Sequence, residues 1–474
     1  MSKYIHILLA AILFVTISAE QYYLVTVKVD DSSVQEIRDH LESKGFDISG
    51  YNKETNRLEI ITDTPRFLEK ECSILQKRNI LFEIDEIVSS ESYESYSNKR
   101  DNAEDYYGPE QTLNELQQLE KTYPKWAKLF NLNEWLGLGS TVEGRSLYAL
   151  QVSLNPDLVE DEAKIVIIGQ HHARELMTHH AVLDSAKDYL KRAQQGDAKF
   201  LSALENSAVW FVPVVNPDGL AYVFSNNRMW RKNRARNNDG SQGVDLNRNY
   251  SFKWGACGSN SSNGSSDIFK GPSPQSESEV KVMDRLNAKL QAQYIISYHS
   301  SGDEVLYPYR CGFMAEANVY NDIRDRLANH VGFGKRVASS SGEDFEHHYG
   351  LYGSISFLLE IGSSFQPSFS TYENRVWPSV QKVLPFMLDE LTKPHVHIKV
   401  LDKDTGKPLA ASLSITEINF KEQEQRIADE HGSYRWRLVP GKYNLSIKMA
   451  KYKEHKIIIQ AGGQKSNYFV ELEK

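Results

Sequence analysis

Two histidines and one glutamate stand where the sequence could hold a metal ion. His172 and Glu175 are three residues apart directly after the apolar run 165–168, and His299 ends a second apolar run, 294–298. A lone His-x-x-Glu pair is more often structural, but a turn from strand to helix can bring both side chains to one point. Two His and one Glu with an open fourth position form a catalytic zinc set. We therefore predict one zinc ion at His172, Glu175 and His299.

A further carboxylate and a polar pair accompany this set. Glu360 lies in the apolar run 355–361, where a buried carboxylate is costly unless something uses it. It can form an internal salt bridge, or act as a general base on a water beside the metal. In Asn247-Arg248, which we call the clamp, a guanidinium beside an amide can bind a carboxylate through two hydrogen bonds.

The elements that would position these residues alternate between apolar strands and amphipathic helices from about residue 107 to 392. This is the pattern of an α/β domain. The expected strands are 164–170, 208–215, 294–299 and 355–361. Ligands in an open α/β sheet gather beyond the carboxyl ends of its strands, where the three metal candidates fall. We predict a mixed twisted sheet flanked by helices over 101–392.

Two smaller units flank this domain. Residues 21–87 have the pattern strand, helix, strand, strand, helix, strand, which predicts a small α/β unit. A polar segment follows, and its Lys99-Arg100 pair could be cut by a trypsin-like or dibasic protease. After Pro394, short alternating strands with turns predict a compact all-β module that ends at Lys474.

Length, composition and charge limit the class of protein. The 474 residues allow about three domains. A net charge of -8 argues against a nucleic-acid surface, which needs excess positive charge. Three cysteines without a CxxC pair exclude a disulfide scaffold and a thiolate zinc cluster.

The first 19 residues have the layout of a secretory signal peptide. Lys3 precedes an apolar run, 5–15, and small residues end at Ala19. The run is shorter than the roughly 18 to 20 residues that a membrane-spanning helix needs. We predict a chain without a membrane span after signal removal. Its destination would be the extracellular space or a lysosomal or vacuolar lumen.

Sequons and cysteines add expectations for that route. Asn249 lies next to the clamp and is expected to be unmodified, whereas Asn260 and Asn263 in a Ser/Gly-rich loop are better glycan acceptors. Cys257 and Cys311 could pair and leave Cys72 free, although free buried thiols fit the sequence nearly as well.

Taken in order, the motifs resemble the zinc metallocarboxypeptidases of the pancreatic carboxypeptidase A and B branch. The matching segments are HHARE (171–175), NPDG (216–219), RMWRKNR (228–234), GVDLNRNY (243–250), YPY (307–309) and FLLEIG (357–362). The resemblance implies hydrolysis of the C-terminal peptide bond of peptides and proteins. It also implies that residues 20–100 are a globular propeptide with its cleavage linker. The tail 393–474 resembles the transthyretin-like β-sandwich of the regulatory carboxypeptidases, which is unusual in this branch.

The resemblance also assigns roles to matching residues. Zinc would be held by the three residues named above. In hydrolysis, Glu360 would act as general base and Arg231 would stabilise the oxyanion. Asn247 and Arg248 would bind the terminal carboxylate of the substrate. Arg174 would assist in the adjoining subsite.

One residue of the family pattern is missing. The family has a Tyr on a mobile loop upstream of its catalytic Glu, and a gapless count back from Glu360 puts Ala338 there. Only a shifted loop could bring Tyr349 or Tyr352 into that role. Because that Tyr mainly assists binding, its absence would affect affinity more than activity.

The C-terminal residue that is removed depends on the pocket. By position, Phe345 takes the place that separates apolar-preferring from basic-preferring members, which predicts release of apolar or aromatic residues. Arg310, directly after the YPY segment, falls near the pocket wall and could instead favour an acidic terminus, unless it turns to solvent.

Two other functions stay open at this point. A zinc amidohydrolase of small acylated amino acids would keep the metal ligands but would not need the clamp together with a propeptide. A non-catalytic secreted peptide-binding protein would be expected to have lost Glu360 or a ligand, and the sequence retains them.

Overall fold

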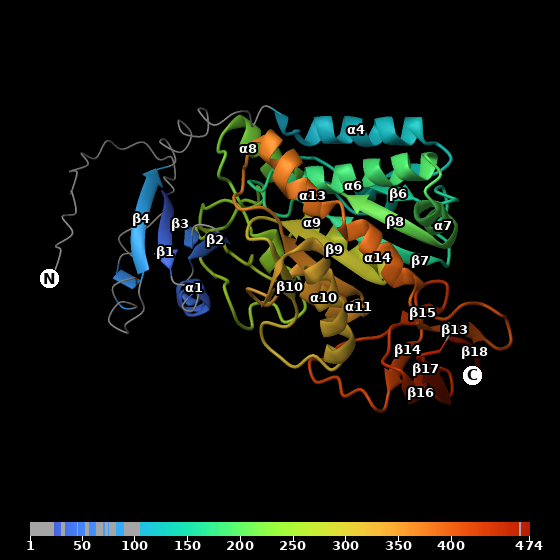
Figure 1. Cartoon of the computed structure of the whole chain (residues 1–474). Coiled ribbons are helices and arrows are strands. Elements are labelled where there is room, and N and C mark those ends of the chain that lie inside the picture. Colours follow the sequence, from blue (N-terminus) through green and yellow to red (C-terminus); the bar gives the residue numbers. More distant parts are fainter. Residues whose placement is uncertain are drawn as a thin grey trace, which may run out of the picture.

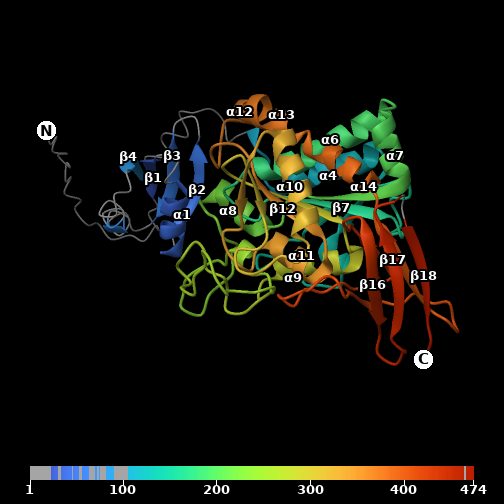
Figure 2. The same ribbon diagram turned by 60° about the horizontal axis from the view of Figure 1, so that its bottom comes forward.

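The computed structural model describes residues 23–29, 34–44, 46–52, 56–62, 70–71, 74, 82–89, 105–463 and 466–474. Three units follow one another along the chain, and the first and last lie at opposite ends of the central one (Figures 1 and 2). The predicted signal peptide, the Lys99-Arg100 pair and Cys72 lie outside the described residues.

The N-terminal unit is an antiparallel sheet with a helix packed on it. The sheet order is β2-β3-β1-β4. The elements are β1 (Tyr23–Val29), α1 (Val34–Ser43), β2 (Asp47–Asn52), β3 (Arg57–Thr62) and β4 (Phe82–Ser89). Ile37 and Leu41, one helical turn apart, bury the apolar face of α1 against Val27 and Leu58. Of the second predicted helix, the described residues Lys70, Glu71 and Ile74 are helical.

The central domain is built on the predicted mixed sheet, which has eight strands in the order β11-β10-β12-β9-β7-β8-β6-β5. Their bounds are β5 (Ala127–Asn131), β6 (Tyr148–Val152), β7 (Ala163–Ile168), β8 (Ser207–Val212), β9 (Tyr294–His299), β10 (Glu304–Tyr307), β11 (Gly334–Val337) and β12 (Ile355–Glu360). The four central strands β12, β9, β7 and β8 are parallel, and all six residues of β8 and of β9 are buried. Parallel strands that are covered on both faces have continuous apolar sequences. The sequence therefore predicts these strands from their apolar runs.

Helices cover both faces of this sheet. On one face Ile165, Ile167 and Phe211 pack with residues of α4, α6, α7, α10 and α14; on the other Val166 and Trp210 pack with α5 and α9. The helices are α4 (Pro109–Thr122), α5 (Leu132–Trp135), α6 (Met177–Gln194), α7 (Ala198–Asn206), α8 (Pro217–Ser225), α9 (Ser278–Leu290), α10 (Ala317–Val331), α11 (Asp344–Tyr352), α12 (Phe369–Thr371), α13 (Trp377–Val380) and α14 (Val383–Thr392), with shorter turns at Leu246–Arg248 and Tyr372–Val376.

The C-terminal unit consists of two three-stranded sheets, β15-β13-β18 and β14-β16-β17. The strands are β13 (Val396–Asp402), β14 (Ser412–Ile415), β15 (Ser433–Trp436), β16 (Gly441–Lys448), β17 (His455–Ala461) and β18 (Ser466–Leu472). Alternate residues point inward: in β13, Val396, Ile398 and Val400 join one apolar core with Leu445 and Ile459 of the other sheet. The all-β module predicted after Pro394 is therefore present.

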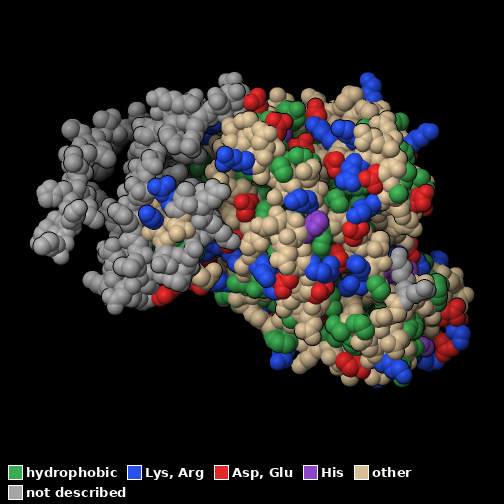
Figure 3. Space-filling model, in the orientation of Figure 1, with side chains coloured by type: hydrophobic (Ala, Val, Ile, Leu, Met, Phe, Trp, Pro, Cys, Tyr) green, Lys and Arg blue, Asp and Glu red, His purple; other side chains and the backbone are tan. Residues whose placement is uncertain are grey.

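The molecular surface carries both signs of charge. Lys and Arg side chains intermingle with Asp and Glu side chains over the described part of the face in Figure 3. Among the described residues, no helix combines the length and apolar character that crossing a bilayer requires.

Candidate active site

The three predicted metal ligands meet at the carboxyl ends of two paired strands. β7 and β9 run parallel, so the loop after β7 and the last residue of β9 reach the same edge of the sheet. Nδ1 of His172 lies 2.7 Å from Oε1 of Glu175. Nδ1 of His299 lies 3.1 Å from Nδ1 of His172 and 3.3 Å from Oε2 of Glu175. All three side chains are buried, and their ligand atoms can face one ion.

This arrangement fits a metal better than a hydrogen-bond network. Two imidazole nitrogens that face each other and a carboxylate supply lone pairs to one point, as a cation requires. Burial raises the pKa of Glu175, but the imidazoles of His172 and His299 outweigh burial and lower it. The other ring nitrogen of His172, Nε2, lies 3.1 Å from Oδ1 of Asp245, the kind of outer contact that orients a metal-binding histidine.

Asp245 also positions Arg231. Its Oδ2 accepts hydrogen bonds from Nε and Nη2 of Arg231 at 3.1 and 2.9 Å. Burial raises the pKa of Asp245, but Arg231 and His172 outweigh burial and hold it well below its usual range. Arg231 is thereby fixed beside the ligand set, with its Nη1 3.9 Å from Glu175.

Glu360 ends β12, in register with His299 of β9. Burial, together with the nearby Glu175, raises the pKa of Glu360, and Arg336 opposes that rise. Nη2 of Arg336 lies 3.7 Å from Oε1 of Glu360, and Oε2 of Glu360 has no hydrogen-bond partner among the described residues. A carboxylate with a raised pKa and an unpartnered oxygen suits proton transfer.

The clamp lies on the short turn Leu246–Arg248 in the same cavity. Oδ1 of Asn247 accepts from the backbone N–H of Asp344 at 2.9 Å, which leaves its Nδ2 as a donor. Nε of Arg248 donates to the carbonyl of Ser259 at 2.6 Å, and its Nη1 lies 3.1 Å from Oε1 of Glu343. Both side chains are therefore held by the surrounding protein, as a preorganised anion site requires.

One cavity joins the metal ligands, Arg231, the clamp and Glu360. Its apolar wall is formed by Ile268, Leu306, Leu358 and Phe365, and Glu343 adds a carboxylate. Burial raises the pKa of Glu343 to about 7, against the opposing effect of Arg248.

Three predicted substrate-binding residues do not line this cavity. Phe345 is buried behind it against Leu306 and Leu358. The guanidinium of Arg174 lies over the Phe365 ring, 4.5 Å from its centroid. Phe345 and Arg174 therefore contact residues of the cavity wall without lining the cavity themselves. Arg310 contacts the N-terminal unit instead.

The structure does not supply the missing tyrosine from α11. Ala338 is buried beside Phe345. The hydroxyl of Tyr349 donates to Glu316 at 3.0 Å, and that of Tyr352 donates to Asp284 at 2.6 Å. Neither tyrosine lines the cavity, so neither takes the expected place over the substrate.

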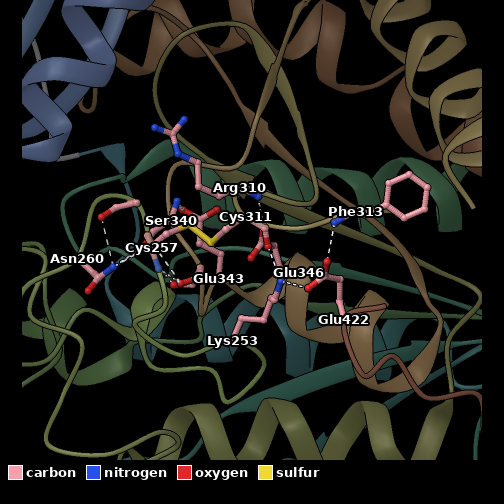
Figure 4. The surroundings of a disulfide bond; sticks show 12 residues. Lys253, Cys257, Asn260, Arg310, Cys311, Phe313, Ser340, Glu343, Glu346 and Glu422 are labelled. Atoms are coloured by element: carbon pink, nitrogen blue, oxygen red, sulfur yellow. Dashed lines mark hydrogen bonds and ion pairs between the residues drawn. A yellow bond between two sulfur atoms is a disulfide. The ribbon is translucent and has the colours of Figure 1, made fainter. Parts of the chain in front are cut away.

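Cys257 and Cys311 form a disulfide, which settles one alternative left open by the sequence (Figure 4). The bond joins the loop after the clamp to the loop after β10.

Asn249 is buried, and its Nδ2 donates to the carbonyls of Lys270 and Ser273. This burial agrees with the expectation that Asn249 is unmodified.

The N-terminal unit lies over the cavity. Glu42, Phe46 and Ile48 line it together with the metal ligands. Arg38 of α1 contacts Glu304, with 3.0 Å between Nη1 and Oε2.

The next residue of α1 makes a second charged contact. Arg310 lies 3.2 Å from Asp39 through Nη1, so the residue predicted near the pocket wall binds the N-terminal unit in this structure.

Sequence reasoning gave no role to Asp245, Glu304, Arg336 or Glu343. Asp245 lies in the motif GVDLNRNY, and a metal-binding histidine commonly pairs with a carboxylate that does not itself bind the metal. That pairing could have indicated a role for Asp245. Arg336 and Glu343 line the cavity, and Glu304 is the ion-pair partner of Arg336. Strand pairing and the turn before α11 place these three residues, and the sequence carries no local pattern for either.

Comparison with known proteins gives the family. Residues 112–462 match the zinc carboxypeptidase family model, and the chain belongs to this family. The metallocarboxypeptidase A of Trichophyton rubrum is 31% identical over 241 residues, which cover 48% of this chain and 56% of the relative. This alignment thus spans little more than half the length of that relative.

Two further comparisons extend over more of the chain. Rat (Rattus norvegicus) carboxypeptidase A2 is 28% identical over 353 residues, which cover 73% of this chain and 76% of the relative. The crystal structure of the carboxypeptidase A from Helicoverpa armigera superposes with a TM-score of 0.62 at 20% identity, covering 78% of this chain and 97% of that one. The central α/β fold is therefore that of the carboxypeptidases, and zinc is the metal that the family binds.

Proposed function

We propose that this chain is a zinc-dependent exopeptidase that removes the C-terminal residue of peptides and proteins. The observation that carries this proposal is the cavity that contains the His172, Glu175 and His299 set, Glu360 and the Asn247-Arg248 clamp. A hydrolytic centre beside a carboxylate-binding pair restricts cleavage to the chain end. The outer carboxylate at Asp245 supports His172 as a ligand.

The residues divide the work of hydrolysis. When bound, zinc would polarise the scissile carbonyl and lower the pKa of a water. Glu360 would accept a proton from the attacking water and deliver it to the leaving amine. Arg231, held by Asp245, would donate hydrogen bonds to the oxygen on which negative charge develops. Asn247 through Nδ2 and Arg248 through its guanidinium would bind the terminal carboxylate.

The pocket favours apolar or aromatic C-terminal residues in this proposal. Ile268, Leu306 and Leu358 supply an apolar wall, and Phe345 fills the space behind it. The charge of Glu343 is balanced by Arg248 at 3.1 Å. Peptides that end in Phe, Leu, Glu or Lys should be cleaved with the highest kcat/KM for Phe and Leu. Fastest release of Lys, lost in Glu343→Gln, would contradict this preference.

We also propose that the intact chain is a secreted zymogen. The N-terminal unit contributes Glu42, Phe46 and Ile48 to the cavity, which blocks the approach of a substrate. A protease that cuts near Lys99-Arg100 would release it. The signal-like residues 1–19 support entry into the secretory pathway, and the C-terminal sheets support a transthyretin-like module.

One assay tests both proposals. The purified intact chain and the chain cleaved at the linker are incubated with an N-acylated dipeptide that ends in Phe, with and without a chelator. Only the cleaved chain without chelator should release Phe, and added zinc should restore activity after chelation. Equal rates before and after cleavage would overturn latency, and chelator-resistant release would overturn the zinc mechanism.

A further inference from the structure

A segment of the C-terminal unit reaches back to the catalytic domain. Residues 417–428, which we call the arm, connect β14 to β15 without regular secondary structure of their own. Two charged side chains and one backbone N–H of the arm contact three parts of the catalytic domain: the loops that the disulfide joins, Glu316 before α10, and the C-terminal end of α11.

The first contact is made by Glu422 near the disulfide (Figure 4). Its carboxylate accepts from the backbone N–H of Phe313 at 2.8 Å and forms an ion pair with Lys253. Nζ of Lys253 also donates to the carbonyl of Cys311 at 2.5 Å. Glu422 therefore holds both loops that the Cys257–Cys311 disulfide joins.

The second contact is a buried ion pair. Nη2 of Arg426 lies 2.5 Å from Oε2 of Glu316, and Nη1 of Arg426 donates to the carbonyl of Tyr349 at 3.1 Å. Oε1 of Glu316 accepts from Nε1 of Trp436 at 2.6 Å. Because these charged groups are buried and paired, the arm has one defined position on the catalytic domain.

The third contact links the arm to α11. The backbone N–H of Gln425 donates to the carbonyl of Gly350 at 2.8 Å, near the C-terminal end of that helix. At its other end, the N–H of Asp344 donates to Oδ1 of Asn247, and Glu343 pairs with Arg248. α11 has nine residues, so it spans about 13 Å as a rigid rod between the arm and the clamp.

We propose that the arm positions the clamp through α11, so that the C-terminal unit sets the affinity for the substrate's terminal carboxylate. Glu422 and Arg426 act as positioning residues. The zinc ligands lie on loops and strands that the arm does not contact through these bonds, so the chemical step is spared. This inference rests on the proposed function for its kinetic test only.

The test uses Glu422→Gln and Arg426→Lys in the full chain after cleavage at the linker. With an N-acylated dipeptide that ends in Phe, KM should rise about fivefold while kcat stays within about twofold. Hydrogen exchange at the Asp344 amide should become faster, because the Asn247–Asp344 hydrogen bond loosens. The conservative Arg426→Lys keeps the charge and serves where a larger change would unfold the chain.

Glu430→Gln is the matched control. Glu430 also joins the C-terminal unit to the catalytic domain, but its partner is Lys289 on α9, at 3.0 Å. This variant should keep the wild-type KM and exchange. Unchanged KM and unchanged exchange in both arm variants would overturn the inference. If the wild-type enzyme cleaves no peptide, the proposed function fails, and exchange at Asp344 alone still decides the role of the arm.

Discussion

The N-terminal and C-terminal units contact the same catalytic domain in different ways. α1 of the N-terminal unit contacts the catalytic domain through Arg38–Glu304 and Asp39–Arg310, and the side chain of Asp39 is 44% exposed. The C-terminal unit uses the Arg426–Glu316 pair, in which the Arg426 side chain is 1% exposed. The Arg38 and Glu304 side chains are themselves only 3% and 12% exposed, but Glu304 also pairs with Arg336 of the catalytic domain at 2.8 Å, so it keeps a partner when the N-terminal unit leaves. Glu316 would lose Arg426, its guanidinium partner, if the C-terminal unit left.

This difference assigns opposite roles to the two units. The N-terminal unit can leave after cleavage at low cost, because Glu304 stays paired with Arg336 and water can replace Asp39 at the partly exposed Arg310. The C-terminal unit is part of the folded domain, because the loss of Arg426 would leave Glu316 buried without its guanidinium partner. In the proposed zymogen, the N-terminal unit would control access to the site, while the C-terminal unit would support the structure around the clamp.

The largest expected effect is on turnover. Glu360→Gln in the cleaved enzyme should lower kcat about 10²- to 10⁴-fold, because the general base is lost, while zinc content and melting temperature stay near wild type. This variant tests the chemical step and leaves the contacts of the N-terminal and C-terminal units unchanged. Near-wild-type kcat would show that Glu360 is not the base, and Glu430→Gln should retain full activity.

Breaking the C-terminal interface should mainly affect stability. Arg426→Ala leaves Glu316 buried without its guanidinium partner and should lower the free energy of unfolding by about 3 to 5 kcal/mol. Denaturant unfolding of the intact and the cleaved chain would measure this. A loss below about 1 kcal/mol would mean that the C-terminal unit is attached as loosely as the N-terminal one.

Breaking the N-terminal interface should mainly affect inhibition. Arg38→Ala removes one partner of Glu304, which keeps Arg336, with 2.8 Å between Nε of Arg336 and Oε2 of Glu304. The separated N-terminal unit should therefore inhibit the cleaved enzyme about tenfold more weakly, with no change in the melting temperature of the enzyme. The matched variant Glu36→Gln, at an exposed position on the same helix, should inhibit like wild type. An unchanged inhibition constant for Arg38→Ala would show that the Arg38–Glu304 ion pair does not contribute to latency.

The smallest effect is expected from mild acid. Burial raises the pKa of Glu304, but Arg38 and Arg336 outweigh burial and lower it to about 2. A depressed carboxyl pKa favours the bound state above the ordinary value of 4.5, and this contribution is lost only as the pH falls toward 2. The intact chain should therefore stay inactive between pH 8 and pH 5. Activity of the uncleaved chain at pH 5, with its mass verified, would show that acid alone releases the N-terminal unit.

The sequence by itself was sufficient for the metal ligands and for the strands that carry them. Parallel strands buried on both faces must be apolar along their whole length, so polar residues at their ends, such as His299 and Glu360, stand out. Local patterns were also sufficient for α1 and the β module after Pro394, because helical and alternating apolar spacings depend only on residues close in the sequence.

Only the tertiary structure decided what surrounds those ligands. Arg336 lines the cavity and pairs with Glu304 because β11, β10 and β12 are neighbours in the sheet. No local sequence pattern indicates which strands become neighbours. The binding of Arg310 to Asp39 and of Glu422 to Lys253 joins residues far apart in the chain. The direction of a long charged side chain is set by the partners that folding brings within reach, so its position in the sequence could not reveal it.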